Sequence, residues 1–324
     1  MKWLVTGASG FTGRHLSLTL RRRGYDVRAF VRDASRVRDL QEGSIEVVEG
    51  DLTDPRAVDR AVAGCDVVCH IAALYRQAKF PDSMYWLVNV EGTRNVLDAA
   101  ERHGVKRVVH CSTVGVHGDV VVPADESAPF DPGDIYQQTK LEGEKLARER
   151  FANGLAGTIV RPTGIYGPGD TRFLKLFRAI ERGTFRMIGD GHVYYHLTYI
   201  DDLVEGIILG AEHPNAVGRT YILGGPRYTT LDELVRTTAA VLGRRLRPGR
   251  IPVAPVLAVA RITETLCRPL GIEPPLHARR VGFFVKNRGF CIERAMNEIG
   301  FSPSVDLQEG LERTARWYRE QGLL

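Results

Sequence analysis

The segment Thr6-Gly7-Ala8-Ser9-Gly10-Phe11-Thr12-Gly13 decides the fold of this chain. It follows the apolar run Trp3-Leu4-Val5, which is typical of a buried strand, and it opens a helical pattern from about Phe11 to Arg23. Glycine permits a tight turn, lets a ligand approach the backbone and allows a helix to pack closely on a strand. The amino end of the helix presents N–H groups that bind phosphate. The segment therefore predicts a phosphate-binding turn between a strand and a helix.

Short apolar runs alternate with helical patterns through the first half of the chain. Strands are expected at Val27–Val31, Ile45–Val48, Val67–Ile71, Val105–Cys111 and Thr158–Arg161, and helices from Asp54-Pro55 onward, at Met84–Arg102 and at Ile135–Phe151. This alternation requires parallel strands joined by right-handed crossovers. A glycine turn after the first strand of such a unit is the signature of dinucleotide binding. We therefore predict an α/β fold of the Rossmann type, with a doubly wound parallel sheet.

The alternation stops after about Gly164. Proline and glycine cluster between Pro162 and Gly169, and the later patterns are mostly helical. We expect helices at Phe173–Arg182, Ile200–Ala211, Leu231–Leu242, Val256–Leu266 and Leu307–Arg319. The chain is thus predicted to hold a dinucleotide-binding domain at residues 1–163 and a smaller, mostly helical substrate-binding lobe at 164–324. The lobe is expected to be discontinuous, with segments that return to the first domain.

The composition is that of an ordinary globular protein. Of the 324 residues, 44% are hydrophobic and 26% are charged, and the net charge is +5. The arginines are scattered, so we expect no nucleic-acid partner. The five cysteines show no paired spacing, which argues against disulfides and a metal site and favours a cytoplasmic protein. Because no apolar run reaches the ~18 residues that span a bilayer, we expect no stable membrane insertion.

Tyr136 and Lys140 stand four residues apart in the motif Tyr-Gln-Gln-Thr-Lys on a predicted helix. This spacing puts both side chains on one helix face. A phenol whose pKa is about 10 is a poor base at neutral pH. A neighbouring ammonium and a positive nicotinamide ring lower that pKa. Tyr136 can then exchange a proton with an alcohol or a carbonyl while hydride moves to or from the nicotinamide.

The GxxGxxG spacing near residue 7, with YxxxK beyond the fifth strand, resembles the extended branch of the short-chain dehydrogenase/reductase superfamily, the NAD-dependent epimerase/dehydratase family. The resemblance covers nearly the whole chain and is more specific in the cofactor half. It implies that Tyr136 and Lys140 are catalytic and also contact the cofactor, with Lys140 bonding the nicotinamide ribose. It further implies cofactor contacts from Gly7, Ser9, Gly10, Phe11, Thr12, Gly13, Asp51, Leu52, Ala72, Ala73, Asn89, Pro162, Thr163 and Ile165.

The segment from His110 to Gly118 resembles the serine-rich segment of this family, which carries the third catalytic group. Counting back from Gly118, the catalytic hydroxyl falls on Thr113, with Ser112 beside it. A threonine hydroxyl can orient a substrate oxygen as a serine hydroxyl does. We therefore expect Thr113 to be catalytic, and a shift of one residue would assign this role to Ser112.

The end of the second predicted strand bears on the choice between NAD and NADP. The strand ends in Phe30-Val31-Arg32, and Val31 occupies the position that is usually acidic in NAD-binding relatives. An arginine such as Arg32 can instead pair with the 2′-phosphate of NADP. Asp33 follows at once and keeps NAD open. We expect NADP, with NAD as the alternative.

Two branches of the family compete for the substrate. The loop Arg161–Asp170 resembles that of 3β-hydroxysteroid dehydrogenases and dihydroflavonol reductases, whereas the segment Tyr195–Asp202 resembles sugar-nucleotide enzymes. Gly164 replaces an asparagine with which sugar-nucleotide enzymes often contact a diphosphate. In either branch the resemblance places three residues toward a small-molecule substrate, namely Tyr166, His196 and Thr198.

We therefore expect an NAD(P)-dependent oxidoreductase that interconverts a secondary alcohol and a ketone, similar to hydroxysteroid or flavanol reductases. A nucleotide-sugar 4-epimerase with tightly bound NAD is the first alternative. A non-catalytic dinucleotide-binding regulator is the second, although such relatives typically lack the tyrosine. Family members often dimerise through two long helices, which here correspond to Met84–Arg102 and Ile135–Phe151, so we expect a homodimer.

Overall fold

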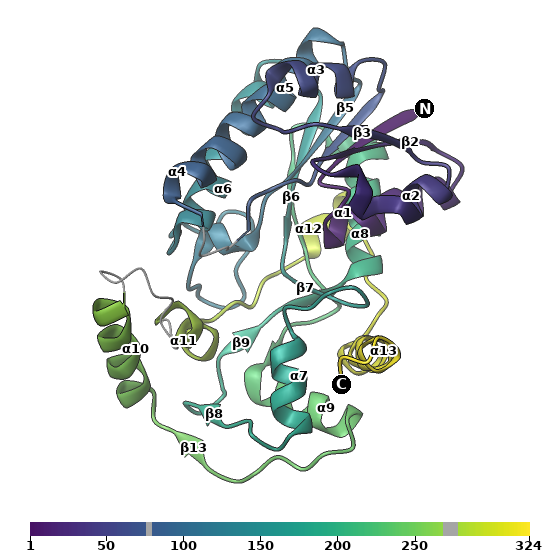
Figure 1. The fold of residues 1–324 in the computed structure, drawn as a ribbon. Coiled ribbons are helices and arrows are strands. Elements are labelled where there is room, and N and C mark those ends of the chain that lie inside the picture. Colours follow the sequence, from purple (N-terminus) through teal and green to yellow (C-terminus); the bar gives the residue numbers. More distant parts are fainter. Residues whose placement is uncertain (76–79, 268–277) are drawn as a thin grey trace.

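A parallel sheet of seven strands forms the centre of the molecule in the computed structural model, which describes residues 1–75, 80–267 and 278–324 (Figure 1). The strands are β1 (Lys2–Thr6), β2 (Asp26–Val31), β3 (Glu46–Glu49), β4 (Val67–His70), β5 (Arg107–Cys111), β6 (Gly157–Pro162) and β11 (Thr220–Leu223). Their order is β11-β6-β5-β4-β1-β2-β3, and each neighbouring pair is parallel. The order changes direction at β1, which defines a doubly wound sheet. The predicted fold class is confirmed.

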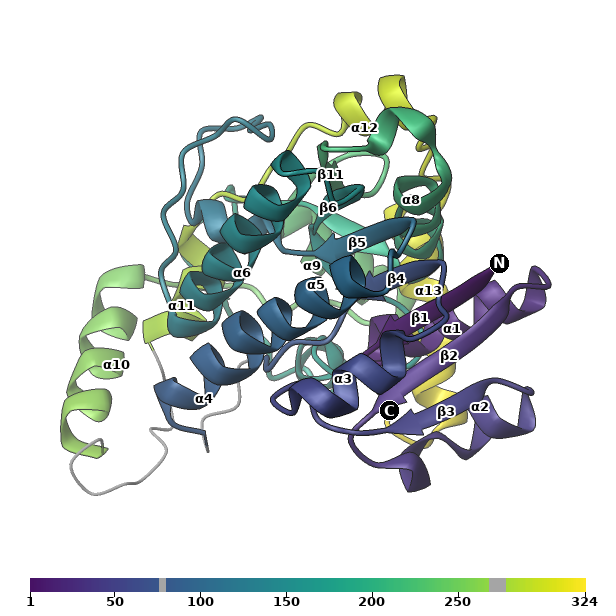
Figure 2. The same ribbon diagram turned by 90° about the horizontal axis from the view of Figure 1, so that it is seen from above.

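Helices cover both faces of the sheet (Figure 2). One face carries α1 (Phe11–Arg22) and α8 (Ile200–Glu212), and the other carries α3 (Pro55–Val62), α5 (Gly92–Arg102) and α6 (Ile135–Ala152). Successive side chains of a strand point to opposite faces. In β1, Trp3 and Val5 therefore join the apolar cluster that contains α1, whereas Leu4 joins the cluster under α3 and α5.

Capping side chains set where several helices begin. Asp54 accepts a hydrogen bond from the Arg56 N–H, and Pro55 occupies the first turn of α3. Asp134 accepts one from the Gln137 N–H at the start of α6. Each carboxylate satisfies an amide that the helix itself leaves without a partner. The predicted helix starts at Asp54-Pro55 and at Ile135 are confirmed.

The predicted regular helix over Met84–Arg102 is wrong in one respect. The structure has α4 (Asp82–Trp86), a π-helical turn (Leu87–Glu91) and then α5. The turn centres on Asn89, whose side-chain amide bonds to the backbone of Leu74 in the loop after β4. A π turn adds a residue to the helix and often marks a functional position. Local periodicity could not predict it, because its cause is a contact with a distant loop.

The second half of the chain forms a small lobe and also returns to the sheet. The lobe contains β7 (Gly164–Tyr166), α7 (Leu174–Glu181), β8 (Met187–Ile188), β9 (Tyr194–Tyr195), β10 (Leu197–Tyr199), β12 (Thr229–Thr230), α9 (Leu231–Val241), β13 (Arg250–Ile251), α10 (Val253–Cys267), α11 (Ala278–Val285) and α13 (Leu307–Glu320). The helix α12 (Glu293–Ile299) instead packs against β11 and α8. The helix α8 packs on the sheet and β11 extends it beyond β6, a seventh strand that we did not predict. The division at residue 163 stays a proposal.

The carboxyl ends of the strands face the lobe (Figure 1). Because β1, β4, β5 and β6 are parallel, their carboxyl ends meet at one edge of the sheet. The chain continues from β6 directly into β7, which pairs with β10. Ligands of doubly wound sheets bind outside this edge, at the point where the strand order changes direction. The predicted site residues of the first half follow these strands.

Candidate active site

The glycine turn after β1 has room only for glycine at two of its positions. Gly7 has a φ of +70°, and a Cβ atom there would lie 2.8 Å from the Cα atom of Ala72. A Cβ atom on Gly13 would lie 2.3 Å from the carbonyl oxygen of Gly7. The turn is closed by a hydrogen bond of 2.9 Å from the Gly10 N–H to the same oxygen. The backbone of α1 can approach the turn this closely because both side chains are missing.

The first turn of α1 offers its N–H groups to an anion. Ser9, Phe11 and Thr12 are half-buried around Gly10, which is exposed. The first turn of α1 contains no acidic residue that would repel a phosphate. Amide groups and the helix dipole both favour a pyrophosphate at this position. The geometry therefore fits the predicted dinucleotide.

Asp33 is engaged in a local turn at the end of β2. Its carboxylate accepts hydrogen bonds from the Ser35 N–H at 3.0 Å and the Ser35 hydroxyl at 2.5 Å. These bonds hold the pKa of the Asp33 carboxyl below its usual value. Arg32 is exposed beside it. A carboxylate that already caps its own turn is a poor partner for a ribose diol, and this favours Arg32 as the residue that meets the adenosine ribose.

Asp51 and Leu52 follow β3 in a tight turn. The Asp51 carboxylate accepts hydrogen bonds of 2.8 Å from both the N–H and the hydroxyl of Thr53. The Leu52 carbonyl accepts one of 2.8 Å from the side chain of Asn95 in α5. Leu52 itself is buried. The turn is thus held from within and by α5, beside the predicted adenine position.

Asn89 connects the loop after β4 to α6. Its Oδ1 accepts a hydrogen bond of 2.7 Å from the Leu74 N–H, and its Nδ2 donates to the Leu74 carbonyl at 3.2 Å and to the Thr139 hydroxyl at 3.0 Å. The Ala72 N–H donates to the Thr6 hydroxyl at 3.1 Å, and Ala73 is half-buried between Ala72 and Leu74. Asn89 therefore acts on the site as a brace, because it holds both the loop that begins at Ala72 and the helix turn that precedes Lys140.

Tyr136 and Lys140 both project from α6, as predicted. Tyr136 is half-buried, and its ring meets that of Tyr75 edge-on, with the centroids 4.9 Å apart. The Lys140 side chain is only 2% exposed. Burial lowers the pKa of its ammonium, and smaller effects of the Cys111 side chain and the Glu144 carboxylate act in the opposite direction. A cation in such a dry site acts strongly on its neighbours, because little water screens it.

Thr113 and Ser112 differ in what their hydroxyls can do. The Thr113 oxygen accepts a hydrogen bond of 3.0 Å from the Gly115 N–H, and the residue is half-buried at the end of β5. A hydroxyl that accepts one bond can still donate its own proton, and a ligand oxygen could receive it. Ser112 is buried, and its hydroxyl lies toward the Glu144 carboxylate, whose pKa it helps to lower. This difference favours Thr113 as the group that meets substrate.

A buried ion pair lies one helical turn beyond Lys140. Glu144 and Arg161 are both fully buried, and the guanidinium donates to the carboxylate at 3.1 Å and 2.6 Å. Arg148 donates to the same carboxylate at 2.9 Å and 2.8 Å. Burial by itself would raise the pKa of Glu144, but the bonds and the charge of Arg161 lower it. The pair joins α6 to β6 and so fixes the helix face that carries Lys140.

The segment after β6 adds polar atoms that a ligand could satisfy. Pro162 is buried, and Thr163 is buried with a hydroxyl that lacks a partner in the described part of the chain. Ile165 is half-buried in β7. A buried polar atom without a hydrogen-bond partner lowers the stability of the fold unless a ligand supplies that bond. Together with the glycine turn, these observations fit a nicotinamide dinucleotide along the strand ends.

Two of the three residues predicted to face substrate turn into the lobe. His196 is buried, with its Nε2 atom 2.9 Å from the carbonyl oxygen of Gly225, and a Cβ atom on Gly224 would lie 2.5 Å from the ring. Tyr166 is buried, and its hydroxyl donates to the Asp306 carbonyl at 3.4 Å. Both side chains therefore pack in the lobe and support a structural role. Thr198 is buried in β10, and its hydroxyl has no partner among the described residues.

Several residues at this edge were not predicted. Tyr75 touches the Tyr136 ring, and Arg172 lies over the rings of Phe11 and Tyr75. Gln137 is buried next to Tyr136 and accepts a hydrogen bond of 2.7 Å from the Gly133 N–H. Tyr75 and Gln137 could have been found as direct neighbours of predicted residues. Arg172 lies on an irregular loop, where no periodic pattern indicates which way a side chain points.

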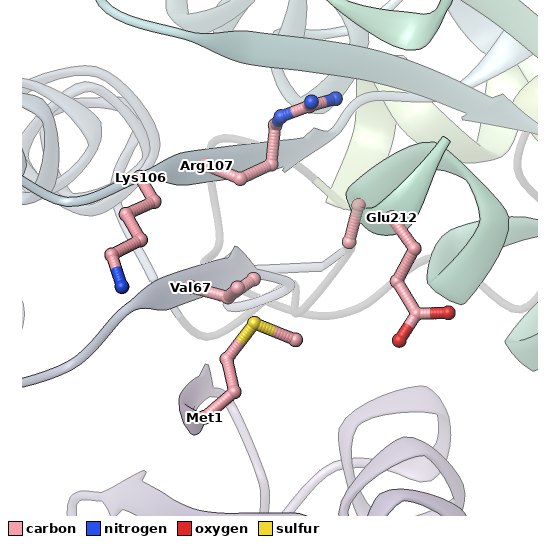
Figure 3. Close-up of a pocket in the computed structure, with 6 residues that line it drawn as sticks. Met1, Val67, Lys106, Arg107 and Glu212 are labelled. Carbon is pink, nitrogen blue, oxygen red and sulfur yellow. The ribbon is translucent and has the colours of Figure 1, made fainter. Parts of the chain in front are cut away.

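A pocket of about 320 Å³ lies at the other edge of the sheet, where β1, β4 and β5 begin (Figure 3). Its lining includes Met1, Val67, Lys106, Arg107 and Glu212. In Figure 3 the side chains of Met1 and Val67 lie between the amine of Lys106 and the carboxylate of Glu212. The pocket contains none of the predicted site residues, so its volume does not mark the catalytic centre.

Comparison with known proteins identifies the family. The model of the NAD-dependent epimerase/dehydratase family matches residues 3–224. The 4-hydroxy-2-methyl-3-oxo-4-farnesyl-3,4-dihydroquinoline-1-oxide ketoreductase of Stigmatella aurantiaca is 32% identical over 96% of this chain and 95% of that protein. A 3-beta-hydroxysteroid dehydrogenase of Mycolicibacterium neoaurum is 30% identical over 98% of this chain and 91% of that protein. The solved structure of MoeE5 in complex with UDP-glucose and NAD is similar at a TM-score of 0.79, with 28% identity over 99% of each chain.

The chain therefore belongs to the NAD-dependent epimerase/dehydratase family, within the extended short-chain dehydrogenases/reductases. It is an NAD(P)-dependent enzyme that acts on a small molecule. The predicted resemblance is confirmed, and the alternative of a non-catalytic regulator is set aside. In the described part of the chain no helix is long and apolar enough to span a membrane, and no group of three or more His, Cys, Asp or Glu side chains could hold a metal ion.

Proposed function

We propose that this enzyme interconverts a secondary alcohol and a ketone by hydride transfer. The observation that carries the proposal is the placement of Tyr136 and Lys140 on α6, with Thr113 at the end of β5 in the same region of the sheet edge. In the reductive direction the carbonyl carbon gains a hydride, and the carbonyl oxygen gains a proton. The bound dinucleotide supplies that hydride in its reduced form and accepts it in the reverse direction.

The protein's own groups handle the proton and the position of the substrate. Tyr136 donates its phenolic proton to the carbonyl oxygen and takes it back when the alcohol is oxidised. Thr113 donates a hydrogen bond to the same oxygen and holds it beside Tyr136. Lys140 stabilises the phenolate through its charge, and it reaches the nicotinamide ribose as in the family. Asn89 holds the loop after β4 and the turn before Lys140 in fixed positions through its hydrogen bonds to Leu74 and Thr139.

We propose NADP as the preferred dinucleotide, with Arg32 as the partner of the 2′-phosphate. The exposed position of Arg32 and the commitment of Asp33 to Ser35 support this choice. A planar guanidinium suits a phosphate because it can donate two parallel hydrogen bonds. NAD stays the alternative, because the similar MoeE5 structure contains NAD.

We propose an apolar ketone or its alcohol as the substrate. Similarity to a ketoreductase and to a hydroxysteroid dehydrogenase supports this class. The position that carries a diphosphate-binding asparagine in sugar-nucleotide enzymes is Gly164 here, and a Cβ atom on it would lie 2.7 Å from Cδ2 of Leu197. The site therefore lacks the amide, and an asparagine at this position would have to displace the end of the Leu197 side chain. The second candidate is a 4-epimerase, which the similarity to MoeE5 with UDP-glucose supports.

One experiment separates the two candidates. The purified enzyme is denatured, and any released nicotinamide is identified by absorbance and mass spectrometry. An empty site that turns over NADPH with apolar cyclic ketones supports the reductase. Stoichiometric NAD, retained through purification, together with interconversion of UDP-sugars and no net NADH, contradicts it and supports the epimerase.

We also propose a homodimer formed through α4, α5 and α6. These helices lie along one side of the molecule (Figure 2). Trp86, the last residue of α4, and Leu87, the first of the π-helical turn, expose 43% and 42% of their surface. Large exposed apolar side chains on helices are typical of an interface. Light scattering during gel filtration should give a dimer for the wild type and a monomer for Trp86→Glu, and a monomeric wild type at micromolar concentration would contradict the proposal.

A further inference from the structure

Arg172 lies on the loop between β7 and α7, and several contacts hold this loop on α1. The His15 ring and the Pro168 carbonyl are 2.9 Å apart, which joins α1 to the loop. A Cβ atom on Gly169 would lie 3.3 Å from the Phe11 ring. The loop belongs to the second half of the chain, yet it covers the first turn of the phosphate-binding helix.

The guanidinium of Arg172 lies between the glycine turn and the catalytic helix. Its central carbon lies 5.5 Å from the centre of the Phe11 ring and 5.8 Å from that of Tyr75. Phe11 is the first residue of α1. The Tyr75 ring meets the Tyr136 ring edge-on, with 4.9 Å between centroids. Arg172 is therefore near both the expected pyrophosphate and the catalytic tyrosine.

The local contacts hold Arg172 in place and keep it charged. Its Nε donates to the Asp170 carboxylate at 2.7 Å, and an Nη2 hydrogen goes to the Ile165 carbonyl at 2.9 Å. Burial alone would lower the pKa of Arg172, but the charge and the hydrogen bond of Asp170 raise it. The Asp170 side chain is 3% exposed, whereas that of Arg172 is 37% exposed. Of the five N–H groups of a guanidinium, the remaining ones can serve a ligand.

We propose that Arg172 binds the pyrophosphate of the dinucleotide from the side opposite the amino end of α1. The α1 amides and the guanidinium would then enclose the same anion, one from each half of the chain. Phosphate is the anion that a planar, multiply donating cation suits best, and the contact with Phe11 places the cation at the phosphate end of the site. The proposal rests on dinucleotide binding and does not depend on which ketone is the substrate.

Calorimetry on two variants of Arg172, Arg172→Met and Arg172→Lys, tests the proposal. The matched control is Arg182→Met, at an exposed arginine directly after α7. The titrants are NADPH, NADH and ADP-ribose, which all contain the pyrophosphate. Loss of a charge-assisted contact should weaken all of them by about 10- to 100-fold in Arg172→Met. Arg172→Lys should retain part of the affinity, and Arg182→Met should match the wild type. Thermal unfolding verifies that each variant is folded.

The salt dependence separates a charge contact from a packing role. Screening weakens an ion contact, so the difference between the wild type and Arg172→Met should shrink as the ionic strength rises. A loss that stays constant with salt and also occurs in Arg172→Lys would mean that Arg172 only shapes the loop, and it would overturn the proposal. Unchanged binding of ADP-ribose to Arg172→Met would overturn the proposal as well. If, in addition, only the KM of the ketone rises, Arg172 contacts the substrate and not the pyrophosphate.

Discussion

The carboxyl edge of the sheet and the small lobe beyond it direct their polar side chains differently. At the sheet edge, the buried Thr163 hydroxyl lacks a partner among the described residues, and the Thr113 hydroxyl, which accepts from the Gly115 N–H, can donate its own proton to a ligand. In the lobe, His196 bonds to the carbonyl of Gly225 and Tyr166 bonds to that of Asp306, and the exception is the Thr198 hydroxyl in β10, which has no partner among the described residues. A buried polar group without a hydrogen-bond partner can bind a ligand, whereas a group that already has its hydrogen bond contributes to the stability of the fold.

This difference follows from how the two regions are built. The sheet edge is made by long parallel strands whose ends must coincide, so polar residues after each strand converge on one line. The lobe contains pairs of strands only two or three residues long, such as β9 with β12 and β10 with β7. Such short pairs do not determine which side chain faces out, and packing against α13 and the neighbouring loops decides it.

Tyr136→Phe should lower kcat by about 10²- to 10⁴-fold, because it removes the proton donor and keeps the ring. The affinity for NADPH should stay close to that of the wild type in a fluorescence titration. Tyr75→Phe is the matched control, since it removes a hydroxyl from the ring that touches Tyr136. Full activity of Tyr136→Phe would break the assignment of the sheet edge as catalytic.

Arg161→Met should lower the free energy of unfolding by about 3–5 kcal/mol, because it leaves the fully buried Glu144 carboxylate without its main partner. Arg148→Met, which removes an exposed partner of the same carboxylate, should cost at most about 1 kcal/mol. Urea unfolding at neutral pH measures both. Equal losses would show that the buried pair does not brace α6 against β6.

Arg32→Ala should raise the Kd for NADPH by about 10- to 100-fold and leave that for NADH within about twofold, because only NADPH carries the 2′-phosphate. Arg36→Ala, an exposed arginine four residues further on, is the control. Calorimetry with both dinucleotides gives the two ratios. Equal losses for NADPH and NADH would refute the assignment of Arg32 as the partner of the 2′-phosphate.

His196→Gln should lower the free energy of unfolding by about 1–3 kcal/mol, because it disturbs a buried hydrogen bond, and it should leave the KM of the ketone within about twofold. Thr113→Val is the contrasting variant at the sheet edge. It should lower kcat/KM with little effect on unfolding. If His196→Gln instead raises KM strongly at unchanged stability, the lobe side chain faces the substrate after all.

His70 should make the fold less stable as the pH falls. Burial, with a smaller effect of the Lys140 charge, lowers its folded-state pKa from 6.5 to about 3. Below pH 6.5 the unfolded chain binds a proton that the folded chain does not, so stability falls until the pH reaches the folded value. The wild type should lose about 1.4 kcal/mol more per pH unit than His70→Gln in this window. Parallel urea midpoints of the two proteins between pH 6.5 and 4.5 would count against this account.

Much of the cofactor half could be predicted from the sequence because the signals there are local. A glycine at Gly7 or Gly13 is required by contacts within one strand, turn and helix, and the spacing of Tyr136 and Lys140 is a property of one helix. The π turn at Asn89 and the strand β11 could not be predicted in this way. The first arises from a bond to Leu74, and the second from pairing with β6 some sixty residues earlier.

The family, the doubly wound sheet and the residues that follow its strands could be predicted from local motifs, short-range periodicity and the rules for parallel strands. The inward packing of His196 and Tyr166 in the lobe, and the approach of Arg172 to the first residue of α1, depend on long-range contacts. So does the buried pair of Arg161 and Glu144 beside the catalytic helix. These facts depend on the packing of segments far apart in the chain, which no local pattern encodes.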